Sequence, residues 1–171
     1  DSFIALASIP HALHLDTGDI NTGPYLRIAT KKIDSMSRPR IAIVWRSGPN
    51  NPYRNCTLED MLPLAELDVN LVSLQLESNE REQDLLERHG IAQAAIGISN
   101  FLDTANQFAN IDALISVDTS VAHLAGAMGI PSWLLLNEPF DPRWEQGDGA
   151  SRWYPNTRML RKPATQDWSG I

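Results

Sequence analysis

The stretch SVDTSVAHLAGAMGIP, residues 116–131, decides the fold. It overlaps an apolar run at 113–117, which ends abruptly in the small polar residues Asp-Thr-Ser at 118–120. A run rich in alanine follows, and Gly129 lies where such a run would stop. This order predicts a buried strand, then a helix over 119–128 that ends at the glycine, which is the repeating unit of parallel α/β sheets.

Similar units lie on both sides of this stretch. Further short apolar runs predict strands at 41–45, 71–76, 94–98, 132–136 and 157–161. Helical segments separate most of these runs. Apolar runs that alternate with helices predict an α/β fold, a Rossmann-like three-layer sandwich with a mostly parallel sheet of about six strands.

Several local signals set expected boundaries. Thr57 is placed to cap one helix, and either Ser78 or Asn79 the next; Thr57 and Asn79 each have an acidic residue three positions later. Pro63 should bend the first helix or confine it to about two turns. A short helix is expected to begin at Asp103 and Thr104. Residues 137–156 are expected to form a long loop.

The organisation along the chain is expected to be simple. Residues 1–37 are interpreted as an N-terminal extension because regular patterns are weak there. Residues 38–171 are interpreted as one domain, which is ordinary for a chain of this length.

Composition excludes several classes of function. The chain has 171 residues and a formal net charge of -7, which argues against general binding of nucleic acid or of an anionic membrane surface. The single cysteine, Cys56, excludes an internal disulfide and a cysteine-based zinc site. No apolar stretch is long enough to span a membrane. We therefore expect a cytoplasmic protein.

One segment is basic within this acidic chain. Residues 35–58 contain no acidic side chain but include four arginines. Two of them, Arg46 and Arg54, lie in the polar loop after the first predicted strand. This loop has neither the GxGxxG pattern of dinucleotide folds nor a P-loop, so it is either a solvated basic loop or one wall of an anion site.

The corner at 118–123 suggests the other wall. Ligands of open parallel sheets bind beyond the carboxyl ends of the strands, and a helix N-terminus favours anions. Thr119 and Ser120 carry hydroxyl groups, and His123 falls in the first helical turn. The same residues would also serve as an ordinary helix cap, so both interpretations stay open. Two such walls at one sheet edge favour a diphosphate ligand.

The chain also resembles a known family over residues 40–168. The matching segments are VWRSGPNNPYRNCTL, LVSLQ, FLDTANQFANIDALISVDTSVAHLAGAMGIPSWLLL and DPRW…SRWYPNTRMLR…DW. They resemble the C-terminal, donor-binding half of bacterial GT-B glycosyltransferases, of the tetratricopeptide-repeat-associated, heptosyltransferase-like family. One departure is Arg54-Asn55-Cys56, which stands where that family usually has an Arg-Ser pair.

The resemblance implies a set of site residues. The residues implied around the donor diphosphate are Thr119, Ser120, Val121, His123, Ser47, Gly48 and Arg54. The residues implied on the ribose or base side are Gln75, Asp103 and Thr104. Asp141, Arg143 and Trp144 match the family's loop after the fifth strand.

The resemblance also implies the chemistry and the partners. The ligand would be a nucleoside-diphosphate sugar, used as a substrate, with no metal and no further cofactor. The acceptor and the catalytic base would belong to the family's N-terminal GT-B half, so no residue of this chain is assigned as catalytic. The expected protein partner is such an N-terminal half or a second copy in a homodimer.

Two alternatives remain from the sequence. The chain could be a stand-alone, non-catalytic nucleotide-binding or oligomerisation module, with Phe3, Ile4, Leu6 or Trp168 exposed for association. It could also be an unrelated Rossmann-like enzyme, although the missing glycine fingerprint counts against that.

Overall fold

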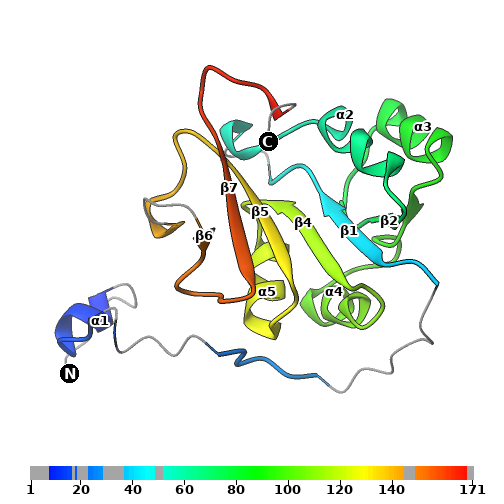
Figure 1. Cartoon of the computed structure of the whole chain (residues 1–171). Helices are drawn as coiled ribbons and strands as arrows, with labels where there is room; N and C mark the ends of the chain where they lie inside the picture. The colour runs from blue at the N-terminus through cyan, green and yellow to red at the C-terminus, as the bar shows by residue number, and fades with distance from the viewer. Residues whose placement is uncertain are drawn as a thin grey trace.

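A computed structural model describes residues 8–16, 18, 23–28, 37–48, 52–144 and 149–168. Within these residues the chain forms a seven-stranded sheet with the order β3-β2-β1-β4-β5-β7-β6 (Figure 1). The strands are β1 Arg40–Val44, β2 Asn70–Ser73, β3 Ala92–Gln93, β4 Ala113–Val117, β5 Ser132–Asn137, β6 Gly149–Ala150 and β7 Thr157–Lys162. All neighbours pair in parallel except β6 and β7. The predicted α/β, mostly parallel fold is confirmed.

Short helices connect the strands. The α-helices are α1 Ile9–Ala12, α2 Leu58–Met61, α3 Glu80–Arg88, α4 Phe101–Phe108 and α5 Ser120–Met128. The 3-10 helices are η3 Pro52–Arg54, η4 Leu62–Glu66 and η5 Pro142–Trp144. Within the described residues, no helix combines the length and apolar character that crossing a membrane requires.

The core lies on both faces of the sheet. On one face Ile43 and Leu71 pack with side chains of α2 and α3, including Met61 and Leu86. On the other face Val44 packs with side chains of α4 and α5 (Figure 1). Because both faces of β1 are buried, its residues are apolar in succession rather than in alternation.

Chain order reverses between two neighbouring strands. From β1 the chain builds outward through β2 and β3, then returns to place β4 on the other side of β1. Strands β1 and β4 are parallel, so the loops that follow them leave the same edge of the sheet and diverge. Such a reversal is where parallel sheets form ligand crevices.

Most expected helix boundaries are confirmed. Thr57 and Asn79 each form a reciprocal capping box, with Asp60 and Glu82 respectively. The α-helix after Thr57 ends at Met61 and continues as a 3-10 helix through Pro63, as its missing amide hydrogen requires.

Three expectations were wrong in detail. The third strand covers residues 92–93 instead of 94–98, because the chain turns at Gly97 with a φ of 83°. Helix α4 begins at Phe101 rather than at Asp103, because Asn100 accepts hydrogen bonds from the amides of its first turn. The expected loop at 137–156 contains η5 and the short strand β6, which pairs antiparallel with β7.

The segment before β1 contacts the domain. The backbone amides of Tyr25 and Leu26 both donate to the carbonyl of Ala127, near the end of α5. The predicted division at residue 37 stays a prediction, and Phe3, Ile4 and Leu6 lie outside the described residues. Trp168 lines an apolar groove of about 730 Å³, together with Trp133 of β5 and Leu160 of β7.

Gly126 offers a test of packing between α5 and the chain that follows β6. A Cβ atom at Gly126 would overlap the ring of Tyr154 at its Cγ, which is not a flexible tip. We expect Gly126→Ala to lower the free energy of unfolding by about 1–3 kcal/mol in urea denaturation, despite alanine's better helix propensity. Gly48→Ala is the control, because an added Cβ there meets nothing. A Gly126→Ala protein as stable as the parent would contradict this packing.

Candidate functional site

A cavity of about 680 Å³ lies at the reversal point, beyond the ends of β1, β2 and β4. Eight of the ten predicted site residues line it, namely Ser47, Gly48, Arg54, Gln75, Thr119, Ser120, Val121 and His123. They come from three loops that are distant in sequence. The structure therefore brings these residues together, and their contact with one ligand stays a prediction.

The N-terminus of α5 forms one wall of the cavity. Thr119 is the N-cap, and its hydroxyl oxygen accepts a hydrogen bond from the amide of Ala122 at 3.2 Å. Most amides of the first helical turn have no partner within the helix, and they lie at the end of the helix where its dipole is positive. The two sequence interpretations are therefore compatible, since Thr119 caps the helix and also lines the cavity.

Asp118 is the buried charge at the base of this wall. The residue is 3% exposed, and its carboxylate lies 3.2 Å from Nη1 of Arg54 and 3.5 Å from Nε2 of His123. Burial is the largest influence on its pKa and raises it. The nearby polar side chains of His123 and Trp144 and the charge of Arg54 together outweigh burial, so the pKa is lowered. Asp118 is thus an anion that holds two predicted site residues, Arg54 and His123, in place.

His123 is held from two further sides. Its Nδ1 lies 3.1 Å from the hydroxyl oxygen of Tyr154, and its ring stacks on Trp144 with centroids 4.9 Å apart. Tyr154 follows β6, and Trp144 ends η5, so both partners come from the segment expected to be a plain loop. These contacts orient the imidazole at the cavity, and the sequence alone did not reveal them.

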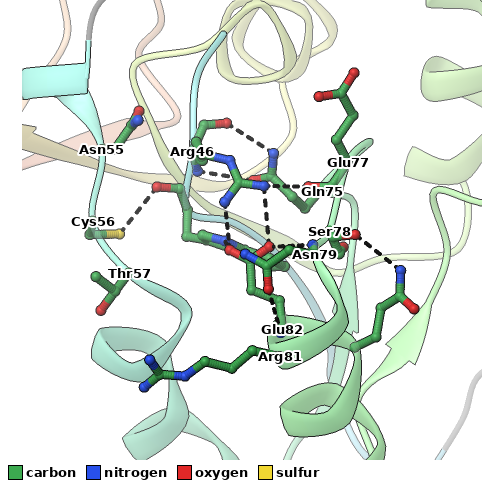
Figure 2. A network of polar contacts seen from close by, with 12 residues as sticks. Arg46, Asn55, Cys56, Thr57, Gln75, Glu77, Ser78, Asn79, Arg81 and Glu82 are labelled. Carbon is green, nitrogen blue, oxygen red and sulfur yellow. Dashed lines mark hydrogen bonds and ion pairs between the residues drawn. The ribbon is translucent and has the colours of Figure 1, made fainter. Parts of the chain in front are cut away.

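The loop after β1 is fixed by a polar network, which Figure 2 shows. The guanidinium of Arg46 makes two contacts with the carboxylate of Glu82, at 2.6 and 3.2 Å, and also donates to the carbonyl of Glu77. Trp45 Nε1 donates to the same carboxylate at 2.8 Å. Arg46 is therefore held by the protein itself, although it was one of the basic residues that suggested an anion site.

Gln75 has a similar internal role. Its side-chain oxygen accepts from the amide of Arg46 at 2.9 Å, and its side-chain nitrogen donates to the carbonyl of Arg46 at 3.2 Å. The side chain thus pairs with the backbone of the β1 loop as a neighbouring strand would (Figure 2). Gln75 lines the cavity, and its amide positions Arg46; a contact with ribose or base stays a prediction.

The second half of the β1 loop is tied to β5. Asn55 accepts from the amide of Ser47 at 2.8 Å, and its own carbonyl accepts from Asn137 Nδ2 at 2.6 Å. Cys56, next in sequence, is buried, which raises the pKa of its thiol to about 12. The thiol is therefore neutral at physiological pH, and this departure from the family's pattern adds no charge.

Asp103 and Thr104 do not line the cavity. The carboxylate of Asp103 accepts from the amide and the hydroxyl of Ser99, and the Thr104 hydroxyl donates to the carbonyl of Asn100. Both side chains serve the start of α4. A role on the ribose or base side stays a prediction for them.

Two charged residues of the loop after β5 complete the site. Arg143 lines the cavity, and Asp141 accepts from both Arg143 and Arg54. The resemblance matched this loop without giving its residues a role. Within the described residues, no three His, Cys, Asp or Glu side chains form a group that could hold a metal ion.

Comparison with known proteins supports the fold. Neither a protein-family model nor a curated protein matches the chain. Among solved structures, it is similar to the ADP-heptose LPS heptosyltransferase II of E. coli, with a TM-score of 0.55 and 16% sequence identity. The match covers 74% of this chain and 39% of the heptosyltransferase, so the chain spans less than half of that protein. The expected Rossmann-like α/β fold is confirmed, and it is similar to part of the heptosyltransferase. Membership of the GT-B glycosyltransferases and association with tetratricopeptide repeats stay predictions.

The Arg46–Glu82 pair predicts how the stability of the fold depends on pH. Burial raises the pKa of Glu82, but hydrogen bonds from Arg46, Asn79 and Trp45 outweigh it and lower the pKa below the ordinary value of a glutamate. A carboxyl with a lowered pKa stabilises the fold above its unfolded-state pKa and loses that contribution as pH falls through the folded-state value. We expect Glu82→Gln to lower the free energy of unfolding at pH 7 by about 1.5–3 kcal/mol.

The difference between Glu82→Gln and the parent should shrink as pH falls from 5 to 3. Urea denaturation across this range measures it, with Glu87→Gln as the control because Glu87 is an exposed carboxylate of the same helix, outside this network. A difference that does not depend on pH would contradict the ionic role of Glu82.

Proposed function

We propose that this chain is the donor-binding domain of a glycosyltransferase and recognises a nucleoside-diphosphate sugar. The observation that carries the proposal is the cavity at the sheet reversal, which the first turn of α5 with His123 lines together with Arg54 and Arg143. Helix amides and guanidinium groups are the donors that proteins use for phosphate oxygens. The fold, similar to that of a heptosyltransferase, is compatible with this function.

Local charge favours a small anion over a polyanion. The net charge of -7 would repel a nucleic acid, whereas three arginines, Arg46, Arg54 and Arg143, line one cavity. In sugar transfer, the bond between the sugar and the diphosphate breaks and negative charge grows on the leaving diphosphate. Preorganised donors around that group would stabilise it.

The acceptor is assigned to another unit. The chain matches 39% of the heptosyltransferase, and none of the cavity residues is proposed here as the base that activates the acceptor. We propose that an N-terminal GT-B half or a second copy of the chain holds the acceptor and supplies this base.

Nucleotide titration tests the donor site. We expect ADP, UDP or GDP to bind in isothermal titration calorimetry, and the bound nucleotide to raise the melting temperature. At about 100 times its dissociation constant, a ligand stabilises the native state by about 2.7 kcal/mol. If none of the three nucleotides binds at millimolar concentration, the proposal is wrong. Slow hydrolysis of a sugar nucleotide by the chain would count against the non-catalytic module, because it would show that the chain retains some of the chemistry.

Matched arginine variants locate the binding. Arg143→Gln should weaken nucleotide binding about tenfold, because it removes a charge-assisted hydrogen bond to phosphate. Arg88→Gln is the control, since Arg88 is also an exposed arginine with an aspartate partner but lies on α3 outside the cavity. Equal affinities of the two variants would place the phosphates elsewhere.

A further inference from the structure

Two arginines are the candidates for phosphate contacts at this cavity, and both are already paired. Arg54 and Arg143 line it from different loops. Arg46 lines it as well, but Glu82 and the carbonyl of Glu77 engage its guanidinium. The state of Arg54 and Arg143 therefore decides how strongly the cavity attracts an anion.

Both arginines converge on one carboxylate oxygen. Nη2 of Arg54 lies 3.0 Å from Oδ2 of Asp141, and Nη2 of Arg143 lies 2.9 Å from the same atom. An oxygen that accepts from two guanidinium groups has the surroundings that proteins commonly give to a phosphate oxygen. The Asp141 carboxylate therefore occupies donors that a phosphate group would use.

The two carboxylates of this cluster are not equivalent. Asp118 has a side chain only 4% exposed at the end of β4, where His123 and Arg54 hold it. Asp141 lies between β5 and η5, and its side chain is 19% exposed. One of its guanidinium partners, Arg143, is 50% exposed. The Asp141–Arg143 pair is therefore the part of the cluster that an entering ligand could separate at low cost.

We propose that Asp141 is an internal competitor for the phosphate groups of the ligand, so that binding of a diphosphate transfers Arg143, and one donor of Arg54, from Asp141 to the ligand. This inference rests on the proposed function and adds a residue that sets affinity. Asp141 lowers the affinity and favours ligands with enough negative charge to displace it. Neutral or weakly charged molecules leave the pairs intact.

The charge of Asp141 persists at working pH. The hydrogen bond from Arg143 has the largest influence on the pKa of Asp141 and lowers it. Burial raises this pKa, but the nearby charges of Arg143 and Arg54 lower it further, so that the pKa is about 2. The charge of Asp141 itself is therefore the same between pH 5 and 9. Charge removal requires a substitution.

Calorimetric titration with ADP, inorganic pyrophosphate and adenosine tests the proposal. Asp141→Asn should bind ADP about fivefold more tightly than the parent, which is the effect of releasing pairs worth about 1 kcal/mol. The affinity for pyrophosphate should rise by a similar factor. The affinity for adenosine should not change, because adenosine lacks the phosphates. Asp141→Ala is a second variant, in case the asparagine keeps hydrogen bonds to both arginines.

Asp68→Asn is the matched control for net charge. Asp68 is paired with Arg38 at 2.7 Å and does not line the cavity, so its substitution should leave the ADP affinity within about twofold. Circular dichroism confirms that each variant is folded before titration.

The outcomes separate the two proposals. If the parent binds ADP and both Asp141 variants bind it equally or more weakly, Asp141 orients the arginines instead of competing, and only this inference is overturned. An equal rise of the ADP affinity in Asp68→Asn would also overturn the inference, because it would show that the change in net charge alone strengthens binding. If neither the parent nor the Asp141 variants bind ADP or pyrophosphate, the donor-site function is overturned and the inference with it.

Discussion

The buried carboxylate of Asp118 is the interaction on which the rest of the site depends. A charge that is 97% removed from solvent is costly unless cations and hydrogen-bond donors surround it. Asp118 meets this requirement by bringing together Arg54 from the loop after β1 and His123 from α5. Arg54 in turn contacts Asp141 after β5. The parallel sheet brings these three segments to one edge, and the ion pairs of Asp118 and Asp141 hold them together there.

A second buried carboxylate organises the opposite wall. Glu82 belongs to the first turn of α3, yet it accepts from Trp45 and Arg46 at the end of β1. The same side chain caps its own helix through the amide of Asn79. The carboxylate of Glu82 therefore both caps α3 and holds the loop after β1, so the position of α3 helps to set the conformation of that loop.

These two networks divide the arginines by role. Arg46 satisfies Glu82 and supports the loop, whereas Arg54 and Arg143 face the cavity beside carboxylates. The fold alone would not have made this distinction, because Rossmann-like folds serve many unrelated functions. The functional proposal therefore depends on the arrangement of side chains at the cavity, and the similarity to the heptosyltransferase at 16% identity adds the fold.

Local physical signals in the sequence determined much of the architecture. The caps at Thr57 and Asn79 and the strand at 113–117 depend on residues within a few positions, so their patterns could be recognised without the fold. Eight of the ten site residues that the family resemblance implied line one cavity, because the carboxyl ends of parallel strands share an edge. Local patterns failed where the signal was short, as in β6 and in the two-residue β3.

Only the tertiary structure decided which polar groups are already engaged. Gln75 pairs with the backbone of Arg46, 29 positions away, and His123 contacts Tyr154, 31 positions away. Arg54 and Asp141 are separated by 87 positions. Contacts of this range depend on how the sheet brings its loops together, since no local pattern encodes which of several arginines will meet a given carboxylate. The sequence by itself determined a parallel α/β sheet with a polar corner at 118–123, and the folded chain decided which charges at that corner are paired.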